Sequence, residues 1–206
     1  MIKCNVKLVG VLTNQPQIRK NKDNEEFISF DVTTTLPDKG EGTKQTISVA
    51  MKKEDLAKAT HPDGTRVQLE GTLMFHKTKD NLYVNLSATS ISADGVPEAD
   101  SITGDIEFRG TIGNDVQQKT DKNQKPYILF SAYSSEKVGD DYTYTWVSFL
   151  QFDTAKPDWM TAKPGIHATG KLQLSIYKDK TGAGRLEIGC TAKSIEQWEK
   201  TYNNNK

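Results

Sequence analysis

One segment of the sequence recurs about one hundred residues later, and this repeat constrains the fold more than any other feature. Val6–Arg19 reads VKLVGVLTNQPQIR, and Ile106–Lys119 reads IEFRGTIGNDVQQK. Further landmarks follow at nearly the same offset: FISF at 27–30 with YILF at 127–130, and EGTL at 70–73 with TGKL at 169–172. A period of this length exceeds a solenoid unit and fits a small domain. The chain is therefore predicted to contain two copies of one domain.

The composition favours thin, half-solvated sheets, and the chain has no net positive charge that would attract a nucleic acid. Hydrophobic residues make up 35% of the 206 residues and the mean hydropathy is −0.64. Thr, Val and Ile, which strands prefer, are plentiful. Lys plus Arg and Asp plus Glu are 27 each, so the formal net charge is zero. A neutral chain argues against nucleic-acid binding unless its charges are segregated by face.

The first copy has the element order of a small barrel. Apolar and polar residues alternate over 2–12, with a bend expected at Gly10. The later segments predict strands over 26–35 and 44–51, a short helix over 52–59, and a hairpin over 66–77 and 82–91. Three strands, a short helix and two strands are the order of the five-stranded OB barrel. The fold class is predicted to be all-β, with two tandem OB-fold barrels.

The second copy repeats this order after an irregular stretch. Ala93–Thr103, ADGVPEADSIT, has no periodicity and is predicted to be a linker. We expect a first domain over 1–93, a linker over 94–103 and a second domain over 104–206. Ser194 and Gln197 have the spacing of a capping box, so a short C-terminal helix is predicted, with Ile195, Trp198 and Tyr202 on one face.

The sequence offers no pattern typical of catalysis or of a cofactor. Its three histidines lie far apart, and no nucleophile–base pair, phosphate loop or metal-ligand spacing is present. We expect neither an enzyme nor a bound cofactor or metal. No window approaches a membrane span, and a cytoplasmic protein is expected. Cys4 and Cys190 are predicted to be reduced, buried thiols, the alternative being a disulfide that joins the chain ends.

Aromatic residues are concentrated in the second copy. Tyr142, Tyr144 and Trp146 alternate with Thr143, Thr145 and Val147, so their rings are predicted to share one face of a strand. OB barrels bind single-stranded nucleic acid by stacking bases on such rings, each stack being worth about 1 to 3 kcal/mol. The alternative is that these rings pack against a partner subunit.

Several motifs resemble those of the bacterial single-stranded DNA-binding (SSB) protein family. They are LVGVLTNQPQIR at 8–19, FDVTTT at 30–35 and GTRVQLEGTL at 64–73, followed by TYTWVSFLQF at 143–152 and GKLQLSIYKDKTG at 170–182. The resemblance implies that Trp146, Phe152 and Tyr177 occupy base-stacking positions. It also implies basic contacts at Arg19 and, in the second copy, Lys119.

These considerations give a set of candidate residues for binding nucleic acid. In the second copy they are Trp146, Tyr177, Phe152, Tyr144, Lys119, Lys171 and Lys178, and in the first copy Arg19, Lys7 and Lys77. The counterparts of Trp146 and Tyr177 in the first copy fall on about Gln45 and Thr78. Binding is therefore expected mainly through the second copy.

The resemblance implies sequence-independent binding of single-stranded DNA in replication, recombination and repair, with RNA left open. It also implies four OB domains, which a homodimer of this chain would supply. The chain ends YNNNK, without the acidic tail through which the family recruits partners. Two alternatives stay open. One is a protein-binding OB accessory factor, primosomal or from a phage, which the neutral charge favours, and the other is an enzyme accessory or structural β-protein of an unrelated family.

Overall fold

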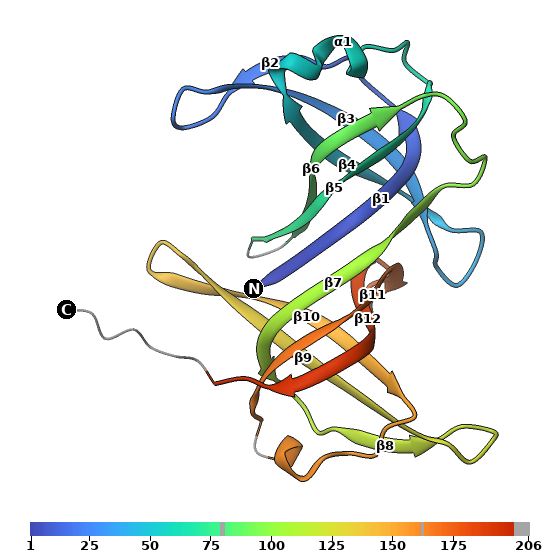
Figure 1. Cartoon of the computed structure of the whole chain (residues 1–206), viewed down its shortest axis with the longest axis vertical. Coiled ribbons are helices and arrows are strands. Elements are labelled where there is room, and N and C mark those ends of the chain that lie inside the picture. Colours follow the sequence, from blue (N-terminus) through green and yellow to red (C-terminus); the bar gives the residue numbers. More distant parts are fainter. Residues whose placement is uncertain (79–80, 162, 200–206) are drawn as a thin grey trace. The chain divides into compact units, whose positions relative to one another are not determined.

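A computed structural model of the chain describes residues 1–78, 81–161 and 163–199, and the chain forms two compact units (Figure 1). One unit comprises residues 3–104 together with 174–187. The other comprises residues 1–2, 105–173 and the described residues from Ile188 to 199. Each unit holds the greater part of one barrel, so the all-β, two-barrel prediction is confirmed.

The first barrel is built from five strands, β1 (Ile2–Leu12), β3 (Glu26–Leu36), β4 (Thr43–Lys52), β5 (Arg66–Lys77) and β6 (Leu82–Ser92). Their order is β3-β4-β6-β5-β1, and pairing of β1 with β3 closes the barrel. The β4–β6 pair is parallel, whereas the other pairs are antiparallel. The short strand β2 (Gln17–Lys20) pairs with β3 in antiparallel orientation. Two short helices, η1 (Lys53–Asp55) and α1 (Leu56–Ala59), connect β4 to β5. This is the OB topology predicted from the sequence.

The second barrel repeats this topology strand for strand. Its strands are β7 (Ser101–Ile112), β9 (Pro126–Val138), β10 (Asp141–Phe152), β11 (Gly165–Lys178) and β12 (Gly184–Gln197). Their order is β9-β10-β12-β11-β7, with β7 pairing β9 to close the barrel and β10 parallel to β12. Short β8 (Gln117–Thr120) extends β9, and η2 (Asp158–Thr161) occupies the place of the helix.

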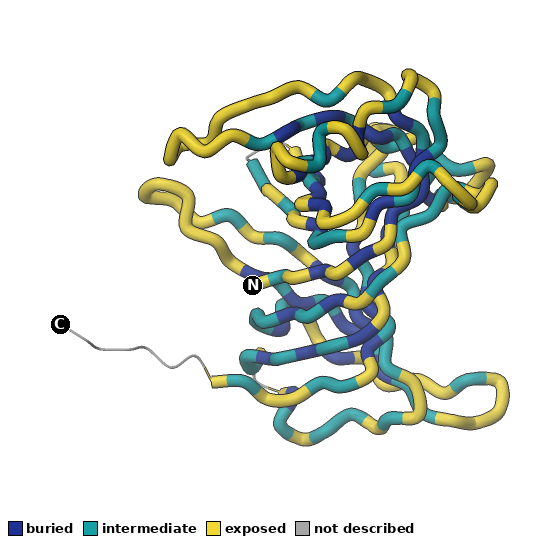
Figure 2. The backbone as a smooth tube through the Cα atoms, turned by 45° about the horizontal axis from the view of Figure 1, so that its top comes forward, coloured by how far each residue is buried: buried dark blue, intermediate teal, exposed yellow. Residues whose placement is uncertain are grey.

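Alternation along the strands divides core from surface, as Figure 2 shows by the colours along the tube. In β3 the side chains of Ile28, Phe30 and Val32 are buried. In the second barrel Phe149 contacts Phe108 edge to face and stacks on Phe130, with ring centroids 5.0 Å apart in each pair. Burying one such side chain stabilises a fold by about 1.5 to 3 kcal/mol.

A glycine in the first strand of each barrel permits the closure. A Cβ at Gly10 would lie 2.5 Å from the Thr33 carbonyl oxygen, and one at Gly110 would lie 2.2 Å from that of Tyr133. The closing pairs, Val11 with Thr33 and Thr111 with Tyr133, follow directly after these glycines. Only a residue without a side chain allows the two backbones to approach so closely.

The predicted C-terminal helix is wrong over the described residues. Ser194–Gln197 belong to β12, and Tyr202 lies outside the part of the chain that the structure describes. The Ser194 hydroxyl bonds to that of Thr169 at 2.8 Å, and the Trp198 amide donates to the Gly165 carbonyl at 2.9 Å. Here the Ser194 hydroxyl, which would have capped a helix, bonds to the neighbouring strand instead. These contacts override the helical spacing of Ile195, Trp198 and Tyr202, which was a pattern of only three residues.

The end of the predicted linker is anchored to the first barrel. Arg66 donates to the Pro97 carbonyl and to the Asp100 carboxylate, both at 2.6 Å, and Asp100 also accepts from the amide and hydroxyl of Thr35. Partial burial opposes ionisation of Asp100, but these hydrogen bonds and the Arg66 charge hold its pKa below the ordinary value. β7 then begins at Ser101.

Both cysteines are buried and neither forms a disulfide, as the first of the two alternatives predicted. Burial raises the pKa of the Cys190 thiol to about 12. Within the described ranges no helix is long and apolar enough to cross a membrane.

Candidate nucleic-acid interface

A row of aromatic side chains covers the outward face of β9 and β10 in the second barrel. In β10 the outward residues Tyr142, Tyr144, Trp146 and Phe152 are each 49 to 57% exposed. Their antiparallel partners in β9 include Tyr133, opposite Trp146, and Tyr127, opposite Phe152. We call these six residues the aromatic stripe. The prediction that Tyr142, Tyr144 and Trp146 share one face is confirmed, since all three are exposed and lie at alternate positions of β10.

Contacts between rings form two groups within the stripe, and the four rings of β10 remain about half exposed. The Tyr133 ring lies between Tyr144, 5.4 Å away and nearly perpendicular, and Trp146, 5.2 Å away and tilted by 55°. Tyr127 and Phe152 are 6.0 Å apart. Such pairs each contribute about 0.5 to 1.5 kcal/mol beyond area burial. The rings that take part in these contacts are thus positioned before any ligand arrives, which lowers the entropic cost of binding.

Gly113 supports the indole of Trp146. A Cβ at Gly113 would lie 2.3 Å from two carbon atoms of the indole's six-membered ring, Cη2 and Cζ3. The indole therefore crosses the backbone at a distance that no other residue permits. The amide of Gly113 donates to the Ser131 carbonyl at 2.9 Å, which fixes this segment beside β9.

Lysines flank the stripe at both of its ends. Lys119 of β8 is opposite Tyr127 in the β8–β9 ladder, so Lys119, Tyr127 and Phe152 form one row across three strands. At the other end Lys137 is opposite Tyr142. Neither lysine forms an ion pair with another described residue. Both ammonium groups are therefore available to an anion that runs along the rings.

The same face of the first barrel has almost the opposite character. Thr33 pairs with Thr46, as Tyr133 pairs with Trp146, and the two hydroxyls are 3.3 Å apart. The counterpart of Trp146 is therefore Thr46, one residue beyond the predicted Gln45. One ring remains, Phe27, with Arg19 and Lys52 as its cross-strand partners.

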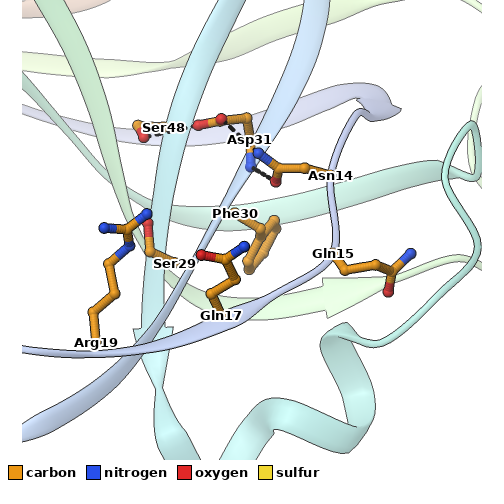
Figure 3. A pocket seen from close by; sticks show the side chains of 8 residues that line it. All are labelled: Asn14, Gln15, Gln17, Arg19, Ser29, Phe30, Asp31 and Ser48. Carbon is orange, nitrogen blue, oxygen red and sulfur yellow. Dashed lines mark hydrogen bonds between the residues drawn. The ribbon is translucent and has the colours of Figure 1, made fainter.

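The first barrel also has a pocket of about 410 Å³ on this face (Figure 3). We call it the polar pocket, and its polar lining includes Asn14, Gln17, Arg19, Ser29, Asp31 and Ser48. Asn14 and Ser48 donate to the two oxygens of the Asp31 carboxylate, at 2.7 and 2.8 Å. In the second barrel Ser131 stands at the offset position of Asp31, so no carboxylate is present there.

Three solved structures of single-stranded DNA-binding proteins resemble the chain. The wild-type protein of Thermus aquaticus has a TM-score of 0.45 and 13% identity over 98% of this chain and 96% of that chain. A deletion mutant of the same protein has a TM-score of 0.46 and 12% identity over 98% of both chains. The small protein of Streptomyces coelicolor has a TM-score of 0.35 and 16% identity over 46% of this chain and 93% of that chain.

No family model and no curated protein matches the sequence. Of these comparisons, the one with solved structures is therefore the one that returns SSB proteins, the family that the sequence motifs resemble. At these scores the assignment of each barrel to the OB fold rests on its own strand order and pairing.

The structure brings together four of the predicted residues, Trp146, Tyr144, Phe152 and Lys119, on one face. Tyr177, 45% exposed, and Lys178 lie in the unit that contains the first barrel. The pKa of Asp38 in that unit is lowered, first by the Thr43 hydroxyl and in smaller part by the charge of Lys178. Arg19 lines the polar pocket.

The remaining cations are less available. Lys171 forms an exposed ion pair with Asp105 at 2.7 Å, and Lys7 forms one with Glu70 at 3.1 Å. Exposed pairs of this kind are worth at most about 1 kcal/mol, so a phosphate can compete for either lysine. Lys77 is half-buried at the end of β5.

Sequence reasoning missed Tyr127, Tyr133, Lys137 and Gly113. Tyr133 could have been found, because the YILF landmark continues as an alternating strand whose outward residues include Tyr127 and Tyr133. Their pairing with Phe152 and Trp146 depends on the β9–β10 register, which the turn at 139–140 sets. The role of Gly113 depends on the ring of Trp146, thirty-three residues later, so the sequence around Gly113 does not predict it.

Proposed function

We propose that the chain binds single-stranded DNA without marked sequence preference, through the aromatic stripe of the second barrel. The observation that carries this proposal is a set of rings on one face, half-exposed in β10, with a lysine at each end that has no ion-pair partner among the described residues. Every base has a π-face, so stacking on rings accepts any sequence and contributes about 1 to 3 kcal/mol per base. The solved structures that the chain resembles are named single-stranded DNA-binding proteins.

Binding is expected to depend moderately on salt. The formal net charge is zero, so the release of counterions comes only from the cations beside the strand. For a single strand the slope of log K against log salt is about 0.7 per phosphate neutralised. Lys119 and Lys137 are the first contacts, and Lys171, Lys178, Lys7, Lys77 and Arg19 are additional proposed phosphate contacts. Tyr177 is proposed as a further stacking ring.

Intrinsic fluorescence tests the proposal directly. Replacing Trp159 and Trp198 by Phe leaves Trp146 as the single indole. Titration with poly(dT) is then expected to quench the emission to saturation. Trp146→Ala is expected to weaken binding by about 1 to 3 kcal/mol. Full emission at saturating oligonucleotide, with unchanged affinity in Trp146→Ala, would exclude the stripe as the DNA site.

A protein partner is the second candidate, and the neutral net charge favours it. In that case the stripe is the core of a protein interface, as in an OB accessory factor. The same variant separates the two functions: Trp146→Ala would then abolish association with the partner and leave oligonucleotide binding unchanged.

We also propose that the native unit is a homodimer that presents four OB barrels to the strand, and that it coats single-stranded DNA during replication, recombination and repair. Sedimentation of the chain, whose mass is 23.0 kDa, is expected to give a species of twice that mass. A monomer at micromolar concentration that still binds oligo(dT) tightly would contradict the dimer. Competition between oligo(dT) and oligo(U) measures the preference for DNA over RNA.

A further inference from the structure

The polar pocket of the first barrel has one end at which hydrogen-bonding groups have no partner among the described residues. The side chains of Gln17, Arg19 and Ser29 form no hydrogen bond or ion pair with any other described residue. Figure 3 shows the three of them grouped at one side of the pocket. Gln17 is directly opposite Ser29 in the β2–β3 ladder, and Arg19 follows two residues along β2 on the same face. This end therefore offers a guanidinium fork and two neutral polar groups.

The other end of the pocket holds a fixed acceptor. The Asp31 carboxylate accepts from the Asn14 amide through Oδ2 and from the Ser48 hydroxyl through Oδ1. Asn14 is itself held, because its Oδ1 accepts from the backbone amide of Asp31 at 2.7 Å. A carboxylate has about four lone-pair positions, so each oxygen can accept one more hydrogen bond. The carboxylate is thus oriented in advance, and both of its oxygens can still bind a donor pair.

The two ends are separated by about the width of one nucleobase. Asp31 and Ser29 are two residues apart on the same face of β3, which corresponds to about 7 Å along the strand. The pocket volume of about 410 Å³ leaves ample room for one planar base. Whatever binds there must present acceptors toward Arg19 and donors toward Asp31.

We propose that the polar pocket binds a guanine base. Guanine has two adjacent acceptors, O6 and N7, which a guanidinium contacts as a pair. It also has two adjacent donors, N1–H and the N2 amino group, which a carboxylate can accept as a pair. Adenine and cytosine present a single amino group each, and thymine has one N–H between two carbonyls, so none of them satisfies both ends.

The proposal deepens the proposed function, on which it rests in so far as the guanine arrives within a single strand. The first barrel would then select one base, while the aromatic stripe accepts any. The second barrel lacks the pocket chemistry, since Ser131 and Leu129 stand at the offset positions of Asp31 and Ser29. A free guanine nucleotide carries the same base, and the experiment separates the two sources.

The first arm titrates the full, isotope-labelled chain with dGMP, followed by NMR, with dAMP, dCMP and dTMP as controls. Only dGMP is expected to shift the amide signals of Asn14, Gln17 and Asp31. The second arm compares oligo(dT) carrying one central dG with the same strand carrying dA. The dG strand is expected to bind about five-fold more tightly or better, the lower end of what one bidentate base contact provides. Inosine, which lacks the N2 amino group, and 7-deazaguanine, which lacks N7, are each expected to remove most of this preference.

Asp31→Ser is the decisive variant, because the chain itself shows that the substitution is tolerated. In the second barrel the amide of Ser131 donates to Asn114 at 2.8 Å, as that of Asp31 donates to Asn14. The variant is expected to lose the dG preference and to keep its affinity for plain oligo(dT). Arg19→Lys, which retains the charge without the fork, is expected to lower the dG preference as well.

Each outcome decides one question. If dGMP shifts the pocket signals but no strand binds, the guanine site stands with a free nucleotide as its ligand, and the proposed function falls. If dGMP binds and strands bind without a dG preference, the site again takes the free nucleotide. If oligo(dT) binds while dGMP shifts nothing and dG gives no preference, the guanine pocket is overturned and the proposed function is untouched.

Discussion

The outward face of β3 and β4 and that of β9 and β10 share one topology and one register, yet they present different chemistry. A Thr pair, Thr33 and Thr46, occupies the positions where the second barrel has Tyr133 and Trp146. Inward positions do not diverge in this way: Phe30 and Phe130 are both buried at the same offset. Closing a barrel requires apolar residues inside and only strand-compatible residues outside. The outward faces are therefore where the two copies can differ in function.

The largest change in oligo(dT) affinity is expected when the Thr pair of the first barrel replaces the two rings of the second. Tyr133→Thr with Trp146→Thr removes two adjacent rings, each worth about 1 to 3 kcal/mol in stacking. We expect a loss of roughly 2 to 5 kcal/mol in the free energy of binding to oligo(dT), since neighbouring rings are not additive. Fluorescence anisotropy of a labelled strand measures it.

The matched control is the same operation on the first barrel. Thr33→Ala with Thr46→Ala removes two hydroxyls that bond to each other and two methyl groups, but no ring, so the affinity for oligo(dT) is expected to stay within about 0.5 kcal/mol of the original. If the two double variants weaken binding equally, the difference between the faces has no functional meaning.

The reverse transfer is expected to create a second stacking surface. Thr33→Tyr and Thr46→Trp supply the rings, but the indole also needs the space that Gly113 gives Trp146. Thr13 stands at that offset position, so Thr13→Gly must be included. In a chain without its other tryptophans, the new indole is expected to be quenched by poly(dT), with a gain of roughly 1 to 3 kcal/mol.

The version that retains Thr13 is the control for this transfer. Its Cβ would meet the indole at the distance found for Gly113, so the ring is expected to be displaced and the gain lost. Quenching of equal size with and without Thr13→Gly would show that the close approach is irrelevant to stacking.

Alternation and the offset were sufficient to predict both barrels, because each strand's burial follows from its own local pattern. They also placed Tyr142, Tyr144 and Trp146 on one face. The contacts that could not be predicted arise from pairing between segments distant in the sequence. They are the ring contact of Tyr133 with Trp146, and the hydrogen bonds from Asn14 and Ser48 to the Asp31 carboxylate. The C-terminal helix failed for the same reason, since the sheet partners of Ser194 lie elsewhere in the sequence.

A smaller effect is expected from Gly113→Ala, which tests whether the indole's position matters apart from its presence. The added methyl would lie 2.3 Å from the ring, so the indole of Trp146 must shift from its present position. We expect a loss of about 1 kcal/mol in oligo(dT) affinity, because a displaced ring stacks less well. Gly139→Ala is a poor control because its φ is positive, whereas Gly40→Ala lies in an exposed turn of the first unit and is expected to leave affinity unchanged. Equal affinities for the chain and Gly113→Ala would indicate that the stripe does not need a fixed indole.

The smallest effect expected is on the salt dependence of binding. Lys119→Ala removes one cation from the end of the stripe and is expected to lower the slope of log K against log salt by about 0.7. Lys125 lies just before β9 and is not among the proposed phosphate contacts, so it is the matched control, and Lys125→Ala is expected to leave the slope unchanged. Arg19→Ala, the offset counterpart, is expected to lower the slope less than Lys119→Ala does, since Phe27 is the single ring that the described residues place beside it on that face.

Titrations of oligo(dT) at several salt concentrations give all four slopes. An unchanged slope in Lys119→Ala would mean that the strand does not pass this end of the aromatic stripe, and equal decreases for Lys119 and Arg19 would mean that phosphates follow both faces alike.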